Sequence, residues 1–468
     1  MGKCFRSDDL NQILLLPPSL HDWLPEKHLA RFVADVVETL DLSALYRSYD
    51  ERDGRGQAAY HPVMMVRLLL YGYCLGVSSS RQIERKSYED VAFRYLSADE
   101  HPDHSTLSEF RKRHLSALAG LFLQALQLCQ KAGLVKLGHV AIDGTKLQAN
   151  ASKHKAMSYG RMSEAEQKLQ AEVAELLRRA EEADAAEDAR FGKGQRGDEL
   201  PEELARRESR IRKIRAAKAE LEAEAKQKAA EQKAAAEAKI AARGEQEART
   251  GQKPGGRDPQ VPDPEKAVPD PKAQRNFTDS ESRIMPDGAN KGSFVQGYNV
   301  QIAVDSAAQV IVATALTQQT NDKQQLAPML GQVERNLGAK PEAVSADAGY
   351  ASEAQLSDER VQGTDLYVAI GRQKHGEGSA TPREAPPPVE GPSAMGQMER
   401  KLKTEAGRAV YRMRKAIVEP VFGQIKERRG FRRFSFRGAA KARAEWELIC
   451  LTHNLLKLFR SGYAFEMI

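Results

Sequence analysis

Two short apolar runs that each end in an aspartate constrain the fold of this chain more than any other feature of its sequence. One run leads into Asp143 and the other, far along the chain, into Asp347. A short apolar run of this kind is typical of a buried strand, which delivers the acid at its end to the edge of a sheet. The pattern therefore predicts neighbouring buried strands, with Asp143 and Asp347 close together at one edge.

The segments after residue 290 alternate between strand and helix patterns. Alternating apolar residues over 294–305 predict a strand, and a second strand follows at 310–316. The remaining expected elements are helices at 323–337 and 352–361, a strand at 365–370, and helices at 404–427 and 439–459. Together with the two aspartate-ending runs, this order predicts an α/β fold with a mixed sheet and flanking helices.

A long charged segment interrupts this α/β pattern. From residue 161 to 250 Ala, Glu, Lys, Arg and Gln dominate, and opposite charges recur three and four residues apart, which favours helices. Glycines within residues 191–197 break the pattern, so we expect two helices, as a hairpin or a coiled coil, with a weak apolar seam. The seam residues are Leu169, Val173, Leu176, Leu177, Ile211, Ile214 and Leu221. Residues 251–279, rich in Pro, Gly, Asp and Lys, are expected to form a disordered linker.

Residues 1–135 show helical periodicity and precede the α/β pattern. Pro62 stands at a first-turn position of one expected helix, and Thr106 with Glu109 forms a capping box at the start of another. We expect an all-α domain for DNA binding or dimerisation, although short helices with scattered basic residues suit any helical bundle equally well.

The positive charge of the chain is concentrated near its C-terminus. The whole chain carries a formal net charge of +6, whereas residues 401–443 alone contain 14 Lys and Arg against 3 Glu. A local excess of that size is typical of a surface that binds phosphates. The alternative is a solvated basic face without a ligand.

Cysteine spacing and the length of the apolar runs indicate where such a chain works. The four cysteines, Cys4, Cys74, Cys129 and Cys450, show no metal-ligand spacing, so we expect neither a zinc site nor disulfides. The longest apolar stretch, residues 63–77, is too short to span a bilayer, and no signal peptide opens the chain. We therefore expect a cytoplasmic protein with no membrane partner.

Two strand-end aspartates and an acid on a neighbouring helix suit metal-dependent phosphoryl transfer. That reaction uses two divalent ions about 3.5–4 Å apart, one activating the attacking oxygen and one stabilising the leaving oxygen. Mg²⁺ prefers hard oxygen ligands and keeps part of its water shell, so a few carboxylates suffice. Glu419 is the candidate third acid. Glu427 competes with it, although the neighbouring Arg428 favours a surface ion pair for Glu427.

Several segments resemble the motifs of insertion-sequence DDE transposases. The similar segments are residues 143–146, 347–350 and 419–426 for the three acidic motifs, 296–301 for the second strand, and 60–62 with 102–106 for an InsH-like N-terminal domain. The resemblance covers about residues 10–155 and 280–460 and leaves the charged segment unmatched. It implies an RNase H-like catalytic domain in residues 136–160 and 280–468, preceded by a DNA-binding or dimerisation domain in residues 1–135.

The resemblance also implies the residues of the catalytic site. Asp143, Asp347 and Glu419 would be the catalytic metal ligands, with Mg²⁺ as the cofactor and Mn²⁺ as a substitute for it. The family signature Tyr-(2)-Arg-(3)-Glu-(6)-Lys occurs here as Tyr411, Arg414, Glu419 and Lys426, one residue longer before the glutamate. At about 100° per residue, Lys426 lies within roughly 20° of Glu419 on the helix. That pair carries over, whereas Tyr411, Arg414 and Lys415 stay alternatives as contacts to the DNA end.

The basic C-terminal stretch supplies the expected contacts to DNA. The residues expected to bind DNA are Lys426, Arg428, Arg429, Arg432, Arg433 and Arg437, together with Lys415 and Tyr411. Cations of this kind position the DNA backbone. The interleaved Phe431, Phe434 and Phe436 either stack on a base displaced from the DNA end or pack onto the last helix.

A bacterial, nucleoid-associated DNA transposase is the function that the resemblance implies. It would cleave at the ends of its element and transfer the strand into target DNA. Its partners would be double-stranded DNA, as terminal inverted repeats and as target, and a second copy of the chain, because two ends must be joined in one complex. Two alternatives stay open: an RNase H-like nuclease or resolvase without strand transfer, and a non-catalytic DNA-binding regulator.

Overall fold

The structure, a computed structural model, divides into two compact units. The described residues are 19–50, 59–191, 202–252, 255–287, 292–371 and 393–463. The first unit comprises Met1–Leu147, Asn299–Phe436 and Ala440–Ile468, and the second comprises Gln148–Tyr298 and Arg437–Ala439. The first unit is therefore discontinuous in sequence, because the second interrupts it.

The N-terminal part of the first unit is helical in the residues that the structure describes. Its helices are α1 (Leu29–Thr39), α2 (Ser43–Asp50), α3 (Pro62–Leu75), α4 (Ser80–Glu89), α5 (Val91–Leu96), α6 (His104–Arg113) and α7 (Leu115–Lys131). As expected, Pro62 opens α3, and Gly76 closes it with a φ of 80°, the left-handed conformation that ends many helices. No single described helix is long and apolar enough to cross a membrane. α3 and α4 together meet that criterion, but the chain turns by 99° between them.

The start of α6 differs from the predicted capping box. The N-cap is Asp103, whose Oδ1 accepts the backbone N–H groups of Ser105 (2.8 Å) and Thr106 (2.9 Å). Thr106 lies inside the first turn, and its hydroxyl donates to Asp103 Oδ2 at 2.7 Å. The prediction was wrong because aspartate is a stronger N-cap than threonine, so the helix begins earlier in the chain.

A mixed sheet forms the centre of the first unit. Its order is β4-β5-β1-β7-β8, with β6 paired to β5. The strands are β1 (His139–Gln148), β4 (Arg283–Pro286), β5 (Phe294–Asp305), β6 (Ile311–Thr317), β7 (Ala343–Ala346) and β8 (Asp365–Val368). β7 runs parallel to β1 and β8, whereas β4 and β6 run antiparallel to β5. β4 and the start of β5 belong to the second unit, so β5 passes from one unit into the other.

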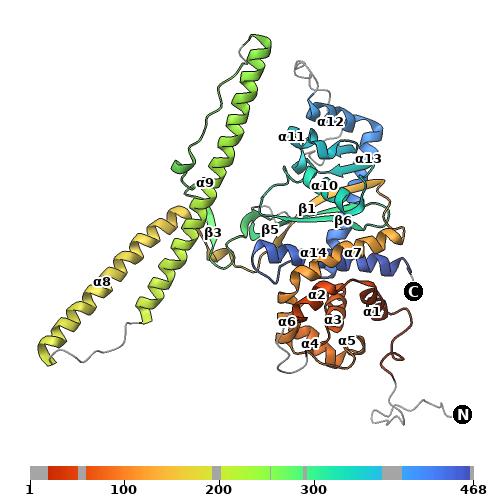
Figure 1. The fold of residues 1–468 in the computed structure, drawn as a ribbon, viewed down its shortest axis with the longest axis horizontal. Coiled ribbons are helices and arrows are strands. Elements are labelled where there is room, and N and C mark those ends of the chain that lie inside the picture. Colours follow the sequence, from red (N-terminus) through yellow and green to blue (C-terminus); the bar gives the residue numbers. More distant parts are fainter. Residues whose placement is uncertain are drawn as a thin grey trace. The chain divides into compact units, whose positions relative to one another are not determined.

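Helices from distant parts of the chain flank this sheet (Figure 1). They are α10 (Leu326–Leu337), α11 (Glu353–Leu356), α12 (Ala394–Lys403), α13 (Glu405–Gly423) and α14 (Ala439–Arg460). α10 packs against β6, and α13 packs against β7 and β8. α14 lies along β5 and β6, because Trp446 Nε1 donates to the carbonyl of Gln301 at 3.3 Å and the Asn454 side chain bonds both backbone groups of Ile311. The α/β fold with a mixed sheet and flanking helices is therefore confirmed.

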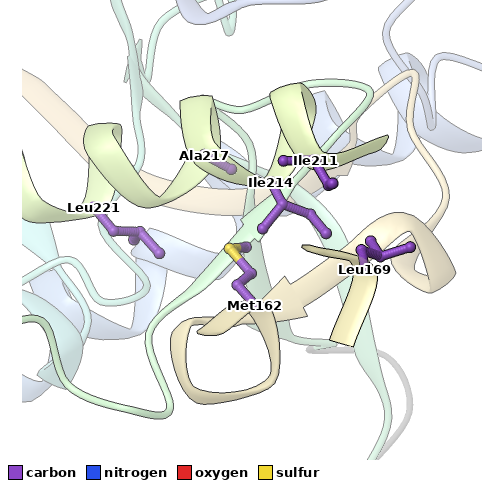
Figure 2. Close-up of a cluster of buried hydrophobic side chains, with 6 residues drawn as sticks. All are labelled: Met162, Leu169, Ile211, Ile214, Ala217 and Leu221. Carbon is purple, nitrogen blue, oxygen red and sulfur yellow. The ribbon is translucent and has the colours of Figure 1, made fainter. Parts of the chain in front are cut away.

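Two long helices dominate the second unit (Figure 1). α8 (Tyr159–Phe191) and α9 (Glu202–Thr250) pack antiparallel, because Tyr159 bonds Glu222 whereas Glu172, further along α8, pairs with Arg207, earlier in α9. Figure 2 shows the buried seam between them, formed by Met162, Leu169, Ile211, Ile214, Ala217 and Leu221. Val173 packs against this cluster, while Leu177 of the expected seam is 41% exposed. Of the expected glycine break at residues 191–197, all but Phe191 lies outside the described residues.

The segment expected to be a disordered linker, residues 251–279, contains ordered elements in the structure. They are the 3₁₀ turn η2 (Pro264–Lys266) and the strand β3 (Gln274–Asn276), which pairs antiparallel with β2 (Ala156–Ser158). Arg275 in β3 is buried and forms ion pairs with two glutamates of α9. The composition of the segment does not reveal this order, because the groups that pair with it are distant in sequence.

Candidate active site

The register between β1 and β7 places Asp143 beside Asp347. Ile142 is paired with Ala346 in this parallel ladder, and the two aspartates are the next residues along the two strands. Each aspartate follows a run of fully buried residues, so the sheet itself determines where the two acids lie. The predicted neighbouring strands are confirmed, and Asp347 directly follows β7 as expected, whereas Asp143 lies within β1, which continues to Gln148.

Asp143 is a largely buried carboxylate with an arginine beside it. Its Oδ1 accepts the backbone N–H of Gly144 at 2.8 Å, and its Oδ2 accepts Arg414 Nη1 at 2.9 Å. The side chains of Arg414 and Asp143 are only 8% and 19% exposed. Burial raises the pKa of Asp143 to about 6; Arg414 opposes that shift, and the like charge of Asp347 adds to it. Keeping the Asp143 carboxylate ionised in this buried position therefore costs solvation free energy.

Asp347 shares this environment. It is the N-cap of the 3₁₀ turn η3 (Ala348–Tyr350), and its Oδ1 accepts the backbone N–H of Gly349 at 2.9 Å. Burial raises the pKa of Asp347 as well, and the bond from Gly349 and the charge of Arg414 lower it. The second acidic motif thus fixes its carboxylate through its own glycine.

A third aspartate, Asp322, lies beside this pair, and sequence reasoning missed it. It stands in the turn between β6 and α10, and its Oδ1 accepts the side-chain amides of Asn299 (2.7 Å) and Gln301 (2.6 Å). Lys146 Nζ is 4.0 Å from the same oxygen. Burial lowers the pKa of Lys146. The negative charges of Asp322, Asp347 and Asp143 oppose that shift, so this one lysine interacts electrostatically with three carboxylates.

Two buried amide side chains on β5 are the sequence feature that could have pointed to a polar partner such as Asp322. Asn299 and Gln301 are two residues apart on this strand, so they face the same side of the sheet, and both are fully buried. Buried amide side chains require hydrogen-bond partners. Two such residues on one face of an apolar strand therefore indicate a polar partner elsewhere in the chain.

Glu419 lies on α13 and is exposed. Within the described part of the chain, no group of three His, Cys, Asp or Glu residues stands ready to hold a metal ion. The structure thus brings Asp143 and Asp347 together but leaves Glu419 outside that group. Lys426, seven residues after Glu419 and within the π-helical turn Gln424–Arg428, donates to Thr145 Oγ1 at 2.9 Å, two residues beyond Asp143 on β1.

The backbone around Glu419 is irregular. Pro420 lies inside α13 and has no N–H for the carbonyl of Ala416, four residues earlier; Gln309 Nε2 donates to that carbonyl instead, at 3.0 Å. A π-helical turn, Gln424–Arg428, follows directly. Such turns occur frequently at functional sites, and this one holds Lys426.

The residues expected to bind DNA divide into exposed and buried cations. Lys415, Arg428, Arg432, Arg433 and Arg437 are exposed, and Lys426 is half-buried. Glu427 forms the expected surface ion pair, but with Arg432 rather than with its neighbour Arg428. Tyr411 is half-buried, with the Arg414 guanidinium 6.0 Å from its ring centre. Arg437 belongs to the second unit, where its Nε donates to Asn150 O at 3.0 Å.

Arg429 does not fit the expected role. It is 6% exposed and donates to Thr452 Oγ1 (2.8 Å), Ile449 O (3.2 Å) and Tyr73 O (3.5 Å). Burial lowers its pKa to about 10. Because its guanidinium already binds protein oxygens inside the first unit, Arg429 is a structural residue that connects α3 to α14, and we remove it from the DNA contacts.

The interleaved phenylalanines are used for packing. Phe431 and Phe434 are buried, and the ring of Phe431 stacks on Tyr73 with centroids 5.3 Å apart. Phe436 lies under Arg111, whose guanidinium is 5.1 Å from the ring centre. The structure therefore favours packing over base stacking, and the partners include the N-terminal helices α3 and α6.

Two families match the chain. Residues 18–113 match the family described as Transposase domain (DUF772), and residues 264–455 match the Transposase DDE domain. The chain belongs to the insertion-sequence DDE transposases. Its core is accordingly RNase H-like, it is an enzyme that acts on DNA, and its family uses divalent metal ions. No curated protein and no solved structure matches the chain.

The matched regions leave out one acid of the site. Asp347 and Asp322 lie within the matched DDE domain, whereas Asp143 precedes it and is separated from it by α8 and α9. β1, which carries the first acidic motif, joins the matched region by lying between β5 and β7 in the sheet. The catalytic core is thus assembled from two segments on either side of the helical insert.

Proposed function

We propose that this transposase cleaves the ends of its own element in the bacterial nucleoid and joins each freed 3′-OH to target DNA. The observation that supports this proposal most directly is the position of Asp143 beside Asp347 on the adjacent parallel strands β1 and β7 of a DDE-family core. The three acidic motifs occur in family order, which argues against a regulator that has lost catalysis.

The donor set fits a divalent cation. Asp143 and Asp347 offer hard carboxylate oxygens, and burial raises the pKa of both, so a cation between them would relieve an unfavourable negative charge. Mg²⁺, or Mn²⁺ in its place, would be held by these two aspartates together with Glu419. When bound, it would activate water and stabilise the charge that develops on the transferred phosphoryl group.

Glu419 has to turn toward the aspartates for this arrangement to form. Its support is the family motif and the nearby Lys426, which already reaches Thr145 on β1. The π-helical turn next to it is a place where α13 can adjust. Asp143, Asp347 and Glu419 therefore remain the proposed metal ligands.

The positively charged residues near the acids have separate proposed roles in neutralising charge and in binding DNA. Arg414 neutralises Asp143, and Lys146 lies among the aspartates. Tyr411 and Lys415, on the same helix as Glu419, would contact the DNA end. The proposed phosphate contacts beyond them are Lys426, Arg428, Arg432, Arg433 and Arg437. These residues fix the position of the duplex without reading its sequence.

The remaining segments are assigned by the same proposal. The helical residues 1–135 would bind terminal inverted repeats and support a homodimer, since two ends must be held in one synaptic complex. Residues 136–160 and 280–468 would form the catalytic domain, separated by the helical insert at 161–250 and the segment 251–279.

The test uses a duplex that carries one element end, with Mg²⁺ and a second, labelled target duplex. Nicking at the end followed by joining to the target is the expected result. Nicking without joining would favour a nuclease or resolvase, and binding without nicking would favour a regulator. Asp347→Asn is the matched control, because it keeps the shape of the side chain and should retain end binding.

A further inference from the structure

Asp322 is held in one orientation by the sheet. Two neutral donors, Asn299 Nδ2 and Gln301 Nε2, bind the same oxygen, Oδ1, at 2.7 and 2.6 Å. Gln301 is itself fixed, because the hydroxyl of the buried Tyr350 donates to its Oε1. Tyr350 follows Asp347 by three residues, so the second acidic motif and Asp322 are connected through one amide.

The glycines of both aspartate motifs leave room for this carboxylate. A Cβ on Gly144, the residue after Asp143, would lie 2.3 Å from Gln301 Nε2 and 3.0 Å from Asp322 Oδ1. A Cβ on Gly349 would lie 3.0 Å from Asp347 Oδ1 and 3.4 Å from Asp322 Oδ2. Neither glycine has the positive φ that would by itself call for glycine. The missing side chains therefore provide space, and in both motifs Asp322 borders it.

Oδ2, the second oxygen of Asp322, accepts no hydrogen bond from the residues that the structure describes. A Cβ on Gly349 would lie 3.4 Å from this oxygen and 3.0 Å from Asp347 Oδ1, so both oxygens lie beside Gly349. Lys146 does not account for the arrangement, because its Nζ is 4.0 Å from Asp322 Oδ1, at the outer limit of an ion pair. One oxygen tied to outer hydrogen bonds and one oxygen open beside a second carboxylate is how proteins orient a metal-binding carboxylate.

We propose that Asp322 is a further carboxylate of the metal site, with its Oδ2 directed at a divalent cation that Asp347 also binds. Asn299 and Gln301 are positioning residues that act through Asp322. The inference rests on the proposed function to the extent that Asp143 and Asp347 hold the metal. It adds an acid that lies outside the three acidic motifs.

The test measures Mn²⁺ binding to the full-length, metal-free protein without DNA, by titration calorimetry and by the rise in melting temperature that Mn²⁺ produces. Asp322→Asn should weaken Mn²⁺ binding at least about tenfold. Asn299→Leu, which removes one donor to Asp322, should weaken it less. Melting in EDTA shows that each variant folds, and Asn299→Leu keeps the inference testable if Asp322→Asn does not fold.

Two comparisons separate the failure of this inference from the failure of the proposed function. If Asp347→Asn loses Mn²⁺ binding and Asp322→Asn keeps it, the inference is overturned and the proposed function stands. If neither variant changes binding, the proposed metal site itself fails. Asp358→Asn removes the same charge from a half-buried position outside the site, where Asp358 pairs with Arg360. If Asp358→Asn weakened Mn²⁺ binding as much as Asp322→Asn does, the effect would come from the change in net charge alone, and the inference would be overturned.

Discussion

The carboxylate site around Asp143 and the helix pair α8–α9 both carry many charges, but they hold them differently. At the carboxylate site, Asp143 and Arg414 form a pair whose side chains are 19% and 8% exposed. On α8, a typical pair is Glu175 with Arg178, whose side chains are 42% and 54% exposed. The first pair is held between strand β1 and helix α13, whereas the second can exchange its partner for water.

This difference indicates where chemistry can occur. Exposed ion pairs contribute about 0–1 kcal/mol each, so a helix pair built from them tolerates change. Buried carboxylates with raised pKa values persist only where the surrounding structure holds them, and such groups concentrate at functional sites. We therefore expect substitutions at the carboxylate site to affect catalysis and substitutions in the insert to affect only local stability.

Neutralising the acids should give the largest effect. Asp143→Asn, Asp347→Asn and Glu419→Gln keep side-chain shape and remove ligand charge, so each should lower cleavage of an element end by at least about a hundredfold. End binding, measured by gel shift on the same preparations, should be largely retained. Glu427→Gln is the control, because Glu427 pairs with Arg432 at the surface. If Glu427→Gln abolished cleavage and Glu419→Gln did not, Glu427 would be the third ligand.

Two adjacent arginines sharpen the contrast between buried and exposed charge. Arg429→Met leaves three protein oxygens without their donor and should lower the free energy of unfolding by about 3 kcal/mol. Arg428→Met changes an exposed side chain and should lower it by less than about 0.5 kcal/mol. Urea unfolding measures both. Equal effects would mean that burial does not distinguish the two residues.

The insert should respond locally. Ile214→Ala creates a cavity in the seam of Figure 2 and should destabilise α8 and α9 by about 2–5 kcal/mol, measured by amide hydrogen exchange. Ile240→Ala on the same helix changes a residue that is 43% exposed and should have little effect. Cleavage should be unchanged in both variants. A loss of cleavage in Ile214→Ala alone would break the comparison and assign the insert a part in catalysis.

Salt dependence should distinguish the basic surface from the charges of the insert. Replacing Arg428, Arg432 and Arg433 by Ala should weaken binding to any duplex and flatten the slope of log K against log[salt] by roughly 0.9 per lost phosphate contact. Preference among sequences should change little. Replacing Arg210, Arg212 and Lys213 of α9, all exposed, removes equal charge in the second unit. Equal slopes in the two triple variants would contradict the proposed DNA path.

The smallest expected effect concerns pH. Burial lowers the pKa of His453 to about 3, so the folded protein holds it neutral, with Nε2 2.9 Å from Gln309 O. Its contribution to stability is complete above its ordinary pKa of 6.5 and is lost as the pH falls toward 3. The loss should approach about 1.4 kcal/mol per pH unit below pH 6. His453→Gln should remove this part of the pH dependence in urea unfolding at pH 5 and pH 7. An unchanged dependence would mean that the fold does not lower the pKa of His453.

Local pattern was sufficient for the elements of the core. The strand that contains Asp143, the strand that precedes Asp347, strands β5 and β6, and the C-terminal helices all follow from periodicity over a few residues, which depends on neighbours in the chain. The start of α6 was misplaced for a local reason too, because Asp103 competes with Thr106 for the same backbone N–H groups.

The chain by itself also determined the resemblance to DDE transposases, since a motif is a property of consecutive residues. Only the tertiary structure decided which of its charged residues are used inside the protein. Arg428 and Arg429 are identical in sequence character, yet Arg429 faces oxygens from α3 and α14, and α3 lies far from it in sequence. Asp322 reads as an ordinary turn residue until β5 places Asn299 and Gln301 against it. Burial depends on which distant segments pack together, and no local pattern contains that information.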